Sequence, residues 1–269
     1  MKIAVCVKQV PDSWAEKKMA GGVLDRASVD AVLNDLDEYA VEEALRIVEA
    51  HSPTGESGEA SGHTITLISM GPDRATDAIR KALSMGADDA IHICDDAFAG
   101  SDALATSLVL AEVIKKNGYD LIICGTESTD ARMSVVPAML AERLGYAQMT
   151  FAGSVTVDPA TSSIAISRVT EIGIEKMTAA LPAVVSVVEK INEPRYPSFK
   201  GIMAAKKKTI TSMALADTGL AAEAVGAKAA WSSVKDALPR PPRGAGIKVE
   251  DSGNGGSALV EFLAEKRLV

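Results

Sequence analysis

Short apolar runs alternate with longer amphipathic segments along most of the chain. The apolar runs are rich in Val, Ile and Ala, as strands buried on both faces are, and they span 2–9, 64–69, 90–94, 120–124 and 183–188. The segments between them repeat their apolar residues with a helical period, and they span 37–50, 73–84, 101–116 and 134–144. This alternation predicts an α/β fold with an open, mostly parallel, doubly wound sheet.

Two internal segments depart from this pattern. Residues 51–62, HSPTGESGEASG, are small and polar, which is typical of a loop insertion. Between residues 155 and 177 apolar and polar residues alternate, which predicts a small antiparallel β-hairpin region that turns at 158–162.

The C-terminal part of the chain differs in composition from the rest. Residues 209–269 are rich in Ala and Gly, with the stiff spacer PRPPRG at 239–244 and an amphipathic stretch at 257–268 that predicts a helix. We therefore expect one α/β domain over 1–208 and an extended C-terminal arm over 209–269. Such an arm cannot build its own core, so it needs a surface, either on its own domain or on a partner subunit.

Composition narrows the classes of function. The net charge of −8 argues against binding to nucleic acid or to an anionic membrane, and the basic run at 206–208 is more typical of a solvated strand or loop end. No apolar stretch approaches the ~20 residues of a membrane span, so we expect no direct membrane insertion. Three cysteines in Val/Ile-rich runs predict buried free thiols and a cytoplasmic protein.

Motifs for catalysis or metal binding are missing from the sequence. The three histidines are far apart, and the acidic pairs Glu42-Glu43 and Asp88-Asp89 are expected to be solvated. We therefore expect no catalytic residues and no metal site, which would suit a carrier whose chemistry belongs to a bound cofactor.

Four segments fall at or just after the carboxyl ends of the predicted strands, where open parallel sheets bind ligands. The residues that we single out in the first three are Cys6, Asn34, Asp35, Leu36, Asp37 and Met70. The fourth is the loop GTESTDARMSVV, which consists of Gly125, Thr126, Glu127, Ser128, Thr129, Asp130, Ala131, Arg132, Met133, Ser134, Val135 and Val136. Its hydroxyls and the helix that follows suit a phosphate, but the same residue types are also what ordinary helix capping requires.

A second candidate surface follows the last predicted strand. Residues 191–208 contain two prolines and fit neither a helical nor a strand period, which predicts an ordered, extended loop. Its aromatic and Met side chains are typical of a docking surface. The composition is equally compatible with a connector whose apolar side chains pack on its own domain.

The residues NEPRY at 192–196 and IMAAKKK at 202–208, preceded by LPAVVSV at 181–187, resemble the β subunit of electron-transfer flavoproteins. The resemblance covers residues 1–208 and is weak beyond them. It implies a Rossmann-like, adenine-nucleotide-binding sheet that holds AMP and pairs with an α subunit, which holds most of an FAD. It also implies electron transfer from flavin dehydrogenases, such as acyl-CoA dehydrogenases, toward a quinone reductase.

The resemblance assigns roles to both candidate surfaces. The four strand-end segments would line the AMP site. The docking surface would be the dehydrogenase-recognition loop, which consists of Asn192, Glu193, Pro194, Arg195, Tyr196, Pro197, Ser198, Phe199, Lys200, Gly201, Ile202 and Met203. Phe199 stands where the family usually has a Leu anchor.

The chain departs from the family at two places. The usual phosphate loop reads roughly GxQxxDDDxNQTG, or DGDTAQVG in electron-bifurcating members; here Asp130 is kept, but the Thr hydroxyl expected at Val136 is absent. Phosphate contacts would therefore fall on backbone N–H groups and Arg132. The Glu that usually follows Arg168 is replaced by Val169. Two alternatives remain: a free-standing adenine-nucleotide-binding regulator or hydrolase, and a bifurcating β subunit with its own FAD.

Overall fold

The computed structural model describes residues 1–21, 23–52, 58, 61–238, 240–244, 246 and 248–269. The chain divides into two compact units, Met1–Lys235 and Asp236–Val269. The first unit therefore extends beyond residue 208, where the expected arm begins.

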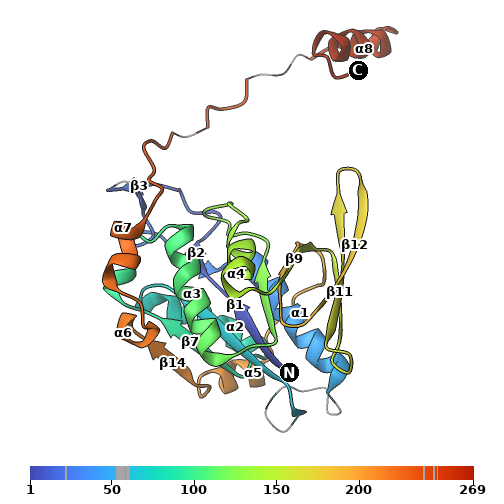
Figure 1. Cartoon of the computed structure of the whole chain (residues 1–269). Helices are drawn as coiled ribbons and strands as arrows, with labels where there is room; N and C mark the ends of the chain where they lie inside the picture. The colour runs from blue at the N-terminus through green and yellow to red at the C-terminus, as the bar shows by residue number, and fades with distance from the viewer. Residues whose placement is uncertain (22, 53–57, 59–60, 239, 245, 247) are drawn as a thin grey trace. The chain divides into compact units, whose positions relative to one another are not determined.

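A seven-stranded sheet forms the centre of the first unit (Figure 1). Its strand order is β14-β7-β6-β1-β8-β13-β9, and every neighbouring pair is parallel. The strands are β1 (Lys2–Cys6), β6 (Thr64–Met70), β7 (Asp89–Ile93), β8 (Leu121–Gly125), β9 (Ala147–Ala152), β13 (Ala183–Val187) and β14 (Ile210–Met213). The five predicted strands and the predicted parallel, doubly wound architecture are confirmed, although the first strand ends at Cys6 and not at residue 9.

Helices cover both faces of this sheet and create two apolar layers. One layer includes α1 (Asp35–His51) and α2 (Thr76–Met85), which follows the short 3-10 helix η2 (Asp73–Ala75). The other includes α3 (Ala103–Asn117), which follows η3 (Asp96–Phe98), and α4 (Val136–Leu144). Figure 1 shows these helices around the sheet. Across the described residues, the structure contains no helix that combines the length and apolar character needed to cross a bilayer.

The predicted hairpin region is a three-stranded antiparallel sheet. It consists of β10 (Ser154–Asp158), β11 (Ser163–Thr170) and β12 (Gly173–Ala180). The long β11–β12 hairpin stands out from the body of the unit (Figure 1). The part of the sequence between β1 and α1 forms two smaller sheets. One pairs β2 (Gln9–Pro11) with β5 (Ala31–Leu33), and the other pairs β3 (Met19–Ala20) with β4 (Val23–Leu24). The expected insertion at 51–62 lies mostly outside the described residues.

The prediction that 191–208 is extended throughout was wrong, because α5 (Phe199–Ala205) lies inside it. The Ser198 hydroxyl accepts a hydrogen bond from the Gly201 N–H at 3.0 Å, and this cap starts the helix directly after Pro197. Gly201 is needed there, since a Cβ atom on it would lie 2.6 Å from the Ser84 carbonyl oxygen at the end of α2.

Residues beyond 208 also contribute to the first unit. β14 pairs with β7 and forms one edge of the central sheet. The chain continues through α6 (Leu215–Thr218), η4 (Ala222–Ala224) and α7 (Gly226–Ala229). The Asp102 carboxylate, which caps α3, also accepts hydrogen bonds from the N–H groups of Trp231 and Ser232. The second unit contains the predicted helix, α8 (Gly255–Glu265).

Candidate functional site

The candidate nucleotide site lies where the winding of the sheet reverses. β1 has β6 on one side and β8 on the other, so the carboxyl ends of these three strands meet at one edge. Cys6 pairs in register with Cys124 of β8 and with Ile68 of β6, and the side chains of Cys6 and Met70 pack on the same apolar layer. This switch point is the place where open α/β sheets bind ligands.

Gly125, at the end of β8, lies against the start of α1. A Cβ atom on Gly125 would lie 2.7 Å from Asp37 Oδ1 and 2.8 Å from the carbonyl oxygen of Leu36. The chain turns away directly afterwards, and both the N–H and the hydroxyl of Thr126 donate to the Val187 carbonyl of β13. Two strands and a helix N-terminus therefore fix the first residues of the loop.

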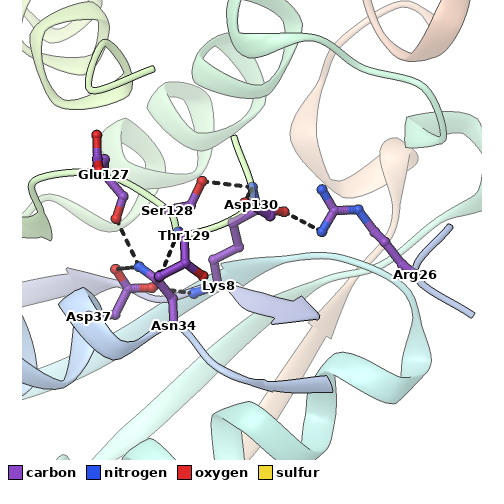
Figure 2. A network of polar contacts seen from close by, with 8 residues as sticks. All are labelled: Lys8, Arg26, Asn34, Asp37, Glu127, Ser128, Thr129 and Asp130. Atoms are coloured by element: carbon purple, nitrogen blue, oxygen red, sulfur yellow. Dashed lines mark hydrogen bonds and ion pairs between the residues drawn. The ribbon is translucent and has the colours of Figure 1, made fainter. Parts of the chain in front are cut away.

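Asn34 joins the α1 segment to the loop, as Figure 2 shows. Its Nδ2 donates to Asp37 Oδ1 at 2.8 Å and to the Glu127 carbonyl at 3.0 Å, and its Oδ1 accepts from the Thr129 N–H at 3.0 Å. Only 1% of Asn34 is exposed. One buried amide thus satisfies polar groups from both segments, so their separation is fixed.

Asp37, near the start of α1, is buried and contacts the chain just after β1. Its Oδ2 accepts the Lys8 N–H at 2.7 Å and its Oδ1 accepts the Asn34 amide. Burial outweighs these two hydrogen bonds and raises the pKa of Asp37 to about 7. Its carboxyl group therefore titrates near neutral pH.

Asp130 is the centre of an ionic cluster in the loop (Figure 2). Its side chain is 1% exposed, and it pairs with Lys8 Nζ at 2.9 Å and with the guanidinium of Arg26. Lys8 Nζ also donates to the Ser128 hydroxyl at 3.2 Å. Burial opposes ionisation, but the Lys8 charge, the Ser128 hydroxyl and the Arg26 charge together lower the pKa of Asp130 to about 2.

The polar residues of the loop do not serve as an ordinary helix cap. Val135 is the N-cap residue of α4, and its side chain makes no capping hydrogen bond within the described structure. The Ser134 hydroxyl instead donates to Glu127 Oε2 at 2.9 Å. Arg132 and Ser134 have φ values of 50° and 56°, a left-handed conformation that non-glycine residues rarely adopt. The arrangement leaves the start of α4 available to an anion through its backbone N–H groups other than at Pro137, which has none.

The structure separates the remaining predicted residues of the loop into two groups. Ala131, Arg132 and Met133 are exposed, and the Arg132 guanidinium lies 4.0 Å from the Glu127 carboxylate. Val135 and Val136 are partly buried where α4 begins. Sequence reasoning missed Arg26, which no motif marks. Lys8 comes two residues after Cys6 in the sequence, but nothing in the sequence marks its partners Ser128 and Asp130.

The expectation that Glu42 and Glu43 are solvated was wrong. Both carboxylates are buried on α1, where they contact the segment that begins with Asn192. Asn192 Nδ2 donates to Glu43 Oε2 at 2.9 Å, and Arg195 donates to both oxygens of Glu42, at 2.7 and 3.0 Å. Arg195 also reaches Glu49 on the next turns of α1. The residues of the NEPRY motif thus fix the segment on α1.

A second set of contacts fixes α5 on α2. Arg80 of α2 donates to the carbonyl oxygens of Ala205, the last residue of α5, and of Lys208, three residues further on. Lys208 Nζ in turn donates to the Leu83, Gly86 and Ala87 carbonyls, which lie at and just after the end of α2. Each helix end is therefore satisfied by a cation from the other segment. Lys208 was expected to be solvated, but it is half-buried, and burial lowers its pKa.

The large apolar side chains of 196–203 remain outside, whereas Ile191 packs on the core. Tyr196 is 95% exposed, Phe199 is 79% exposed, and Ile202 and Met203 are each 44% exposed. The backbone beneath them is held by α1 and α2, so the exposure is a fixed feature of the surface. A connector tucked onto its own domain would bury these side chains.

The described residues show few signs of any other functional site. The structure contains no cluster of three His, Cys, Asp or Glu side chains suited to a metal ion there, and Cys6, Cys94 and Cys124 are free thiols. His92 is buried and bonded to the Gly71 carbonyl. Arg168 lies 3.5 Å from Glu175, while Val169 is exposed. A cavity of about 570 Å³ lies at the amino end of the sheet, around Lys2 and Tyr119.

The fold and the edge residues define a Rossmann-like α/β protein with a preformed loop suited to an anion at the switch point. Residues 21–218 match the family model described as "Electron transfer flavoprotein domain". The chain belongs to this electron transfer flavoprotein family.

Similar proteins cover the whole chain. An "Electron transfer flavoprotein subunit beta" from Mycobacterium leprae is 47% identical over 99% of both chains. One with the same name from Megasphaera elsdenii is 34% identical over 99% of this chain and 97% of its own. The "Caffeyl-CoA reductase-Etf complex subunit CarD" from Acetobacterium woodii is 33% identical over all of both chains.

Proposed function

We propose that this chain is the β subunit of a heterodimeric electron-transfer flavoprotein in the cytoplasm. It accepts electrons from flavin dehydrogenases, such as acyl-CoA dehydrogenases, and passes them toward a quinone reductase or the respiratory chain. It carries AMP, and it covers one side of an FAD held mainly by the α subunit. The chain is an electron carrier in this proposal, because the flavin supplies the chemistry.

The observation that carries the proposal is the exposed apolar surface on a fixed base at 191–203. Tyr196 is almost fully exposed and Phe199 largely so, although aromatic side chains of a monomer are usually buried. Arg195 and Asn192 hold the backbone on α1, so little conformational entropy is lost when a partner binds. Such a preorganised surface suits repeated, short-lived docking of dehydrogenases.

The donor set at the switch point suits the phosphate of AMP. Lys8 and Arg26 supply positive charge, and the uncapped start of α4 supplies N–H groups. Asn34, Leu36 and Asp37 would border the ribose and base, with Cys6 and Met70 as apolar walls. Most polar side chains of the loop already have partners elsewhere in the chain or in the loop, which fits phosphate recognition by backbone groups.

The C-terminal unit supports assembly with an α subunit. Leu259, Val260 and Phe262 of α8 are 40–60% exposed. An amphipathic helix of this kind is stable only when another surface covers its apolar side. We assign that surface to the α subunit. Trp14, Leu36 and Arg168 are the residues of this chain that we place toward the FAD.

Co-expression with an α subunit tests the proposal. We expect a 1:1 complex with the absorption spectrum of one FAD, which a reduced acyl-CoA dehydrogenase reduces in a stopped-flow experiment. The chain expressed alone should be colourless and should release AMP on denaturation, as mass spectrometry would detect. FAD bound to the isolated chain would favour the bifurcating alternative. AMP without α binding would favour the free-standing regulator or hydrolase.

A further inference from the structure

Two cations of the candidate site, Lys8 and Arg26, are paired with one buried carboxylate. Lys8 follows β1, Arg26 lies between β4 and β5, and Asp130 belongs to the loop after β8, so the three residues come from distant parts of the sequence. Lys8 and Arg26 are about 40% exposed, whereas the Asp130 side chain is almost fully buried. The carboxylate is therefore the fixed member of the cluster, and solvent reaches the two cations.

Arg26 is brought to this position by an ordered backbone. The Arg74 guanidinium, next to the end of β6, donates to the carbonyl oxygens of Arg26, Ala27 and Val29 at 2.6, 3.3 and 3.1 Å. The Asp25 carboxylate accepts the N–H groups of Ala27 and Ser28 and closes the turn on the other side. The Arg26 side chain thus starts from a backbone fixed on both sides.

We propose that Asp130 determines how many phosphate groups the nucleotide in this site carries. Lys8, Arg26 and Asp130 together have a net charge of +1. This charge suits the phosphate of a nucleoside monophosphate, whereas each further phosphate adds negative charge beside a buried carboxylate. The inference rests on the proposed function, because it assumes that a nucleotide occupies this loop.

The energetic argument concerns charges in a partly buried site. In such a site the effective dielectric constant is about 20, so a further negative charge is repelled by Asp130 more strongly than it would be in water. Asp130 is held ionised by its two partners, so its charge persists at neutral pH. Replacing it by Asn raises the local charge to +2, and the preference for a monophosphate over a di- or triphosphate should fall by about tenfold or more.

The test uses the heterodimer with its α subunit, purified in EDTA so that no divalent cation neutralises the phosphates. Nucleotides released on denaturation are separated by anion-exchange chromatography. We expect almost only AMP from the wild type, and a ratio of ADP plus ATP to AMP about tenfold higher from Asp130→Asn. The control Glu142→Gln removes the same charge from an exposed position on α4, and its ratio should equal that of the wild type.

Arg26→Met gives a second, opposite test that keeps Asp130 in place. It lowers the local charge to zero, so the ratio should fall below that of the wild type. An unchanged ratio in both variants, or loss of all nucleotides in equal proportion, would overturn the inference and leave Asp130 a purely structural role. Complete absence of nucleotide from the wild type would instead contradict the proposed AMP site, and the inference with it.

Discussion

Arg195 donates to both carboxylate oxygens of Glu42, with Nε 2.7 Å from Oε2 and Nη2 3.0 Å from Oε1. Glu42 is buried on α1, and the partner that neutralises it comes from 153 residues further along the chain. Such a planar, two-point contact is specific to Arg, because a Lys ammonium offers only a point charge. The position of the proposed docking surface therefore depends on this pair.

The first prediction concerns Arg195→Met. Breaking a buried pair leaves an uncompensated charge and typically costs ~3–5 kcal/mol, but Arg195 is partly solvated, so we expect about 2 kcal/mol less free energy of unfolding in urea. The double variant Arg195→Met/Glu42→Leu should regain most of that stability. A double variant as unstable as the single one would show that the buried charge is not the cause.

The second prediction concerns Phe199→Ala. Because Phe199 is 79% exposed, its truncation should leave the melting temperature and FAD content unchanged. Truncating an anchor residue commonly costs ~2 kcal/mol of binding energy, so flavin reduction at low dehydrogenase concentration should slow by about thirtyfold. Leu104→Ala, on the exposed start of α3, is the control and should react like the wild type. A normal rate for Phe199→Ala would contradict the docking assignment.

Elements with a strong local signal could be predicted from the sequence. Gly86, with a φ of 150°, is the C-cap residue of α2 and lies two residues after the predicted helical segment 73–84. Asp102 caps α3, one residue after the predicted start at Ser101. The parallel strands were equally clear, because burial on both faces makes them continuous apolar runs.

Features that depend on distant partners were not predictable. α5 is a short helix after two prolines, and it is stabilised by Arg80 and Lys208 rather than by its own period. β14 is a four-residue edge strand whose pairing with β7 leaves little trace in the sequence.

The same distinction applies to the candidate site. The rule that ligands bind at strand ends identified Asn34, Asp37 and the loop, and the structure brings these residues together. The rule says nothing about Arg26, whose position is determined by the hydrogen bonds from Arg74. The burial of Glu42 could not be predicted either, because its partner Arg195 is distant in the sequence and covers it only in the folded chain.

The third prediction concerns the C-terminal unit. Truncation after Lys235 removes α8 and leaves the first compact unit whole, so the melting temperature of the isolated chain should not change. Affinity for the α subunit should fall by at least tenfold, as measured by titration of labelled protein. Truncation after Lys208 also removes β14 and exposes β7, so it should destabilise the chain itself. Full α affinity in the first truncation would contradict the role of the arm.

The fourth prediction concerns pH. The pKa of Asp37 is raised to about 7 in the folded chain, above its unfolded value near 3.8, so the native state binds this proton more tightly. The free energy of unfolding should therefore fall as pH rises from about 4 to about 7, by at most roughly 4 kcal/mol.

Asp37→Asn removes this contribution, so stability measured by urea unfolding at pH 5 and pH 8 should differ less than in the wild type. Burial also raises the pKa of Glu43, although Asn192 opposes the shift, which is why the variant must be compared with the wild type. An identical pH dependence in both proteins would show that Asp37 keeps an ordinary pKa.

The last prediction concerns Gly125, where β8, α1 and the loop meet. A Cβ atom on this residue would lie 2.8 Å from backbone atoms of Leu36 and 2.7 Å from Asp37 Oδ1. Backbone atoms at the start of a packed helix cannot move aside cheaply, so Gly125→Ala should cost about 1–3 kcal/mol of stability. It should also push Asn34 away from the loop, since Asn34 directly precedes α1, and AMP retained by the purified chain should fall severalfold. Gly153→Ala is the matched control: its Cβ would meet the Ser167 carbonyl oxygen at an ordinary 3.6 Å. Both stability and AMP content should then equal those of the wild type. A Gly125→Ala variant with wild-type stability and AMP content would show that α1 can move, and that the close approach of Leu36 to β8 is not needed for binding.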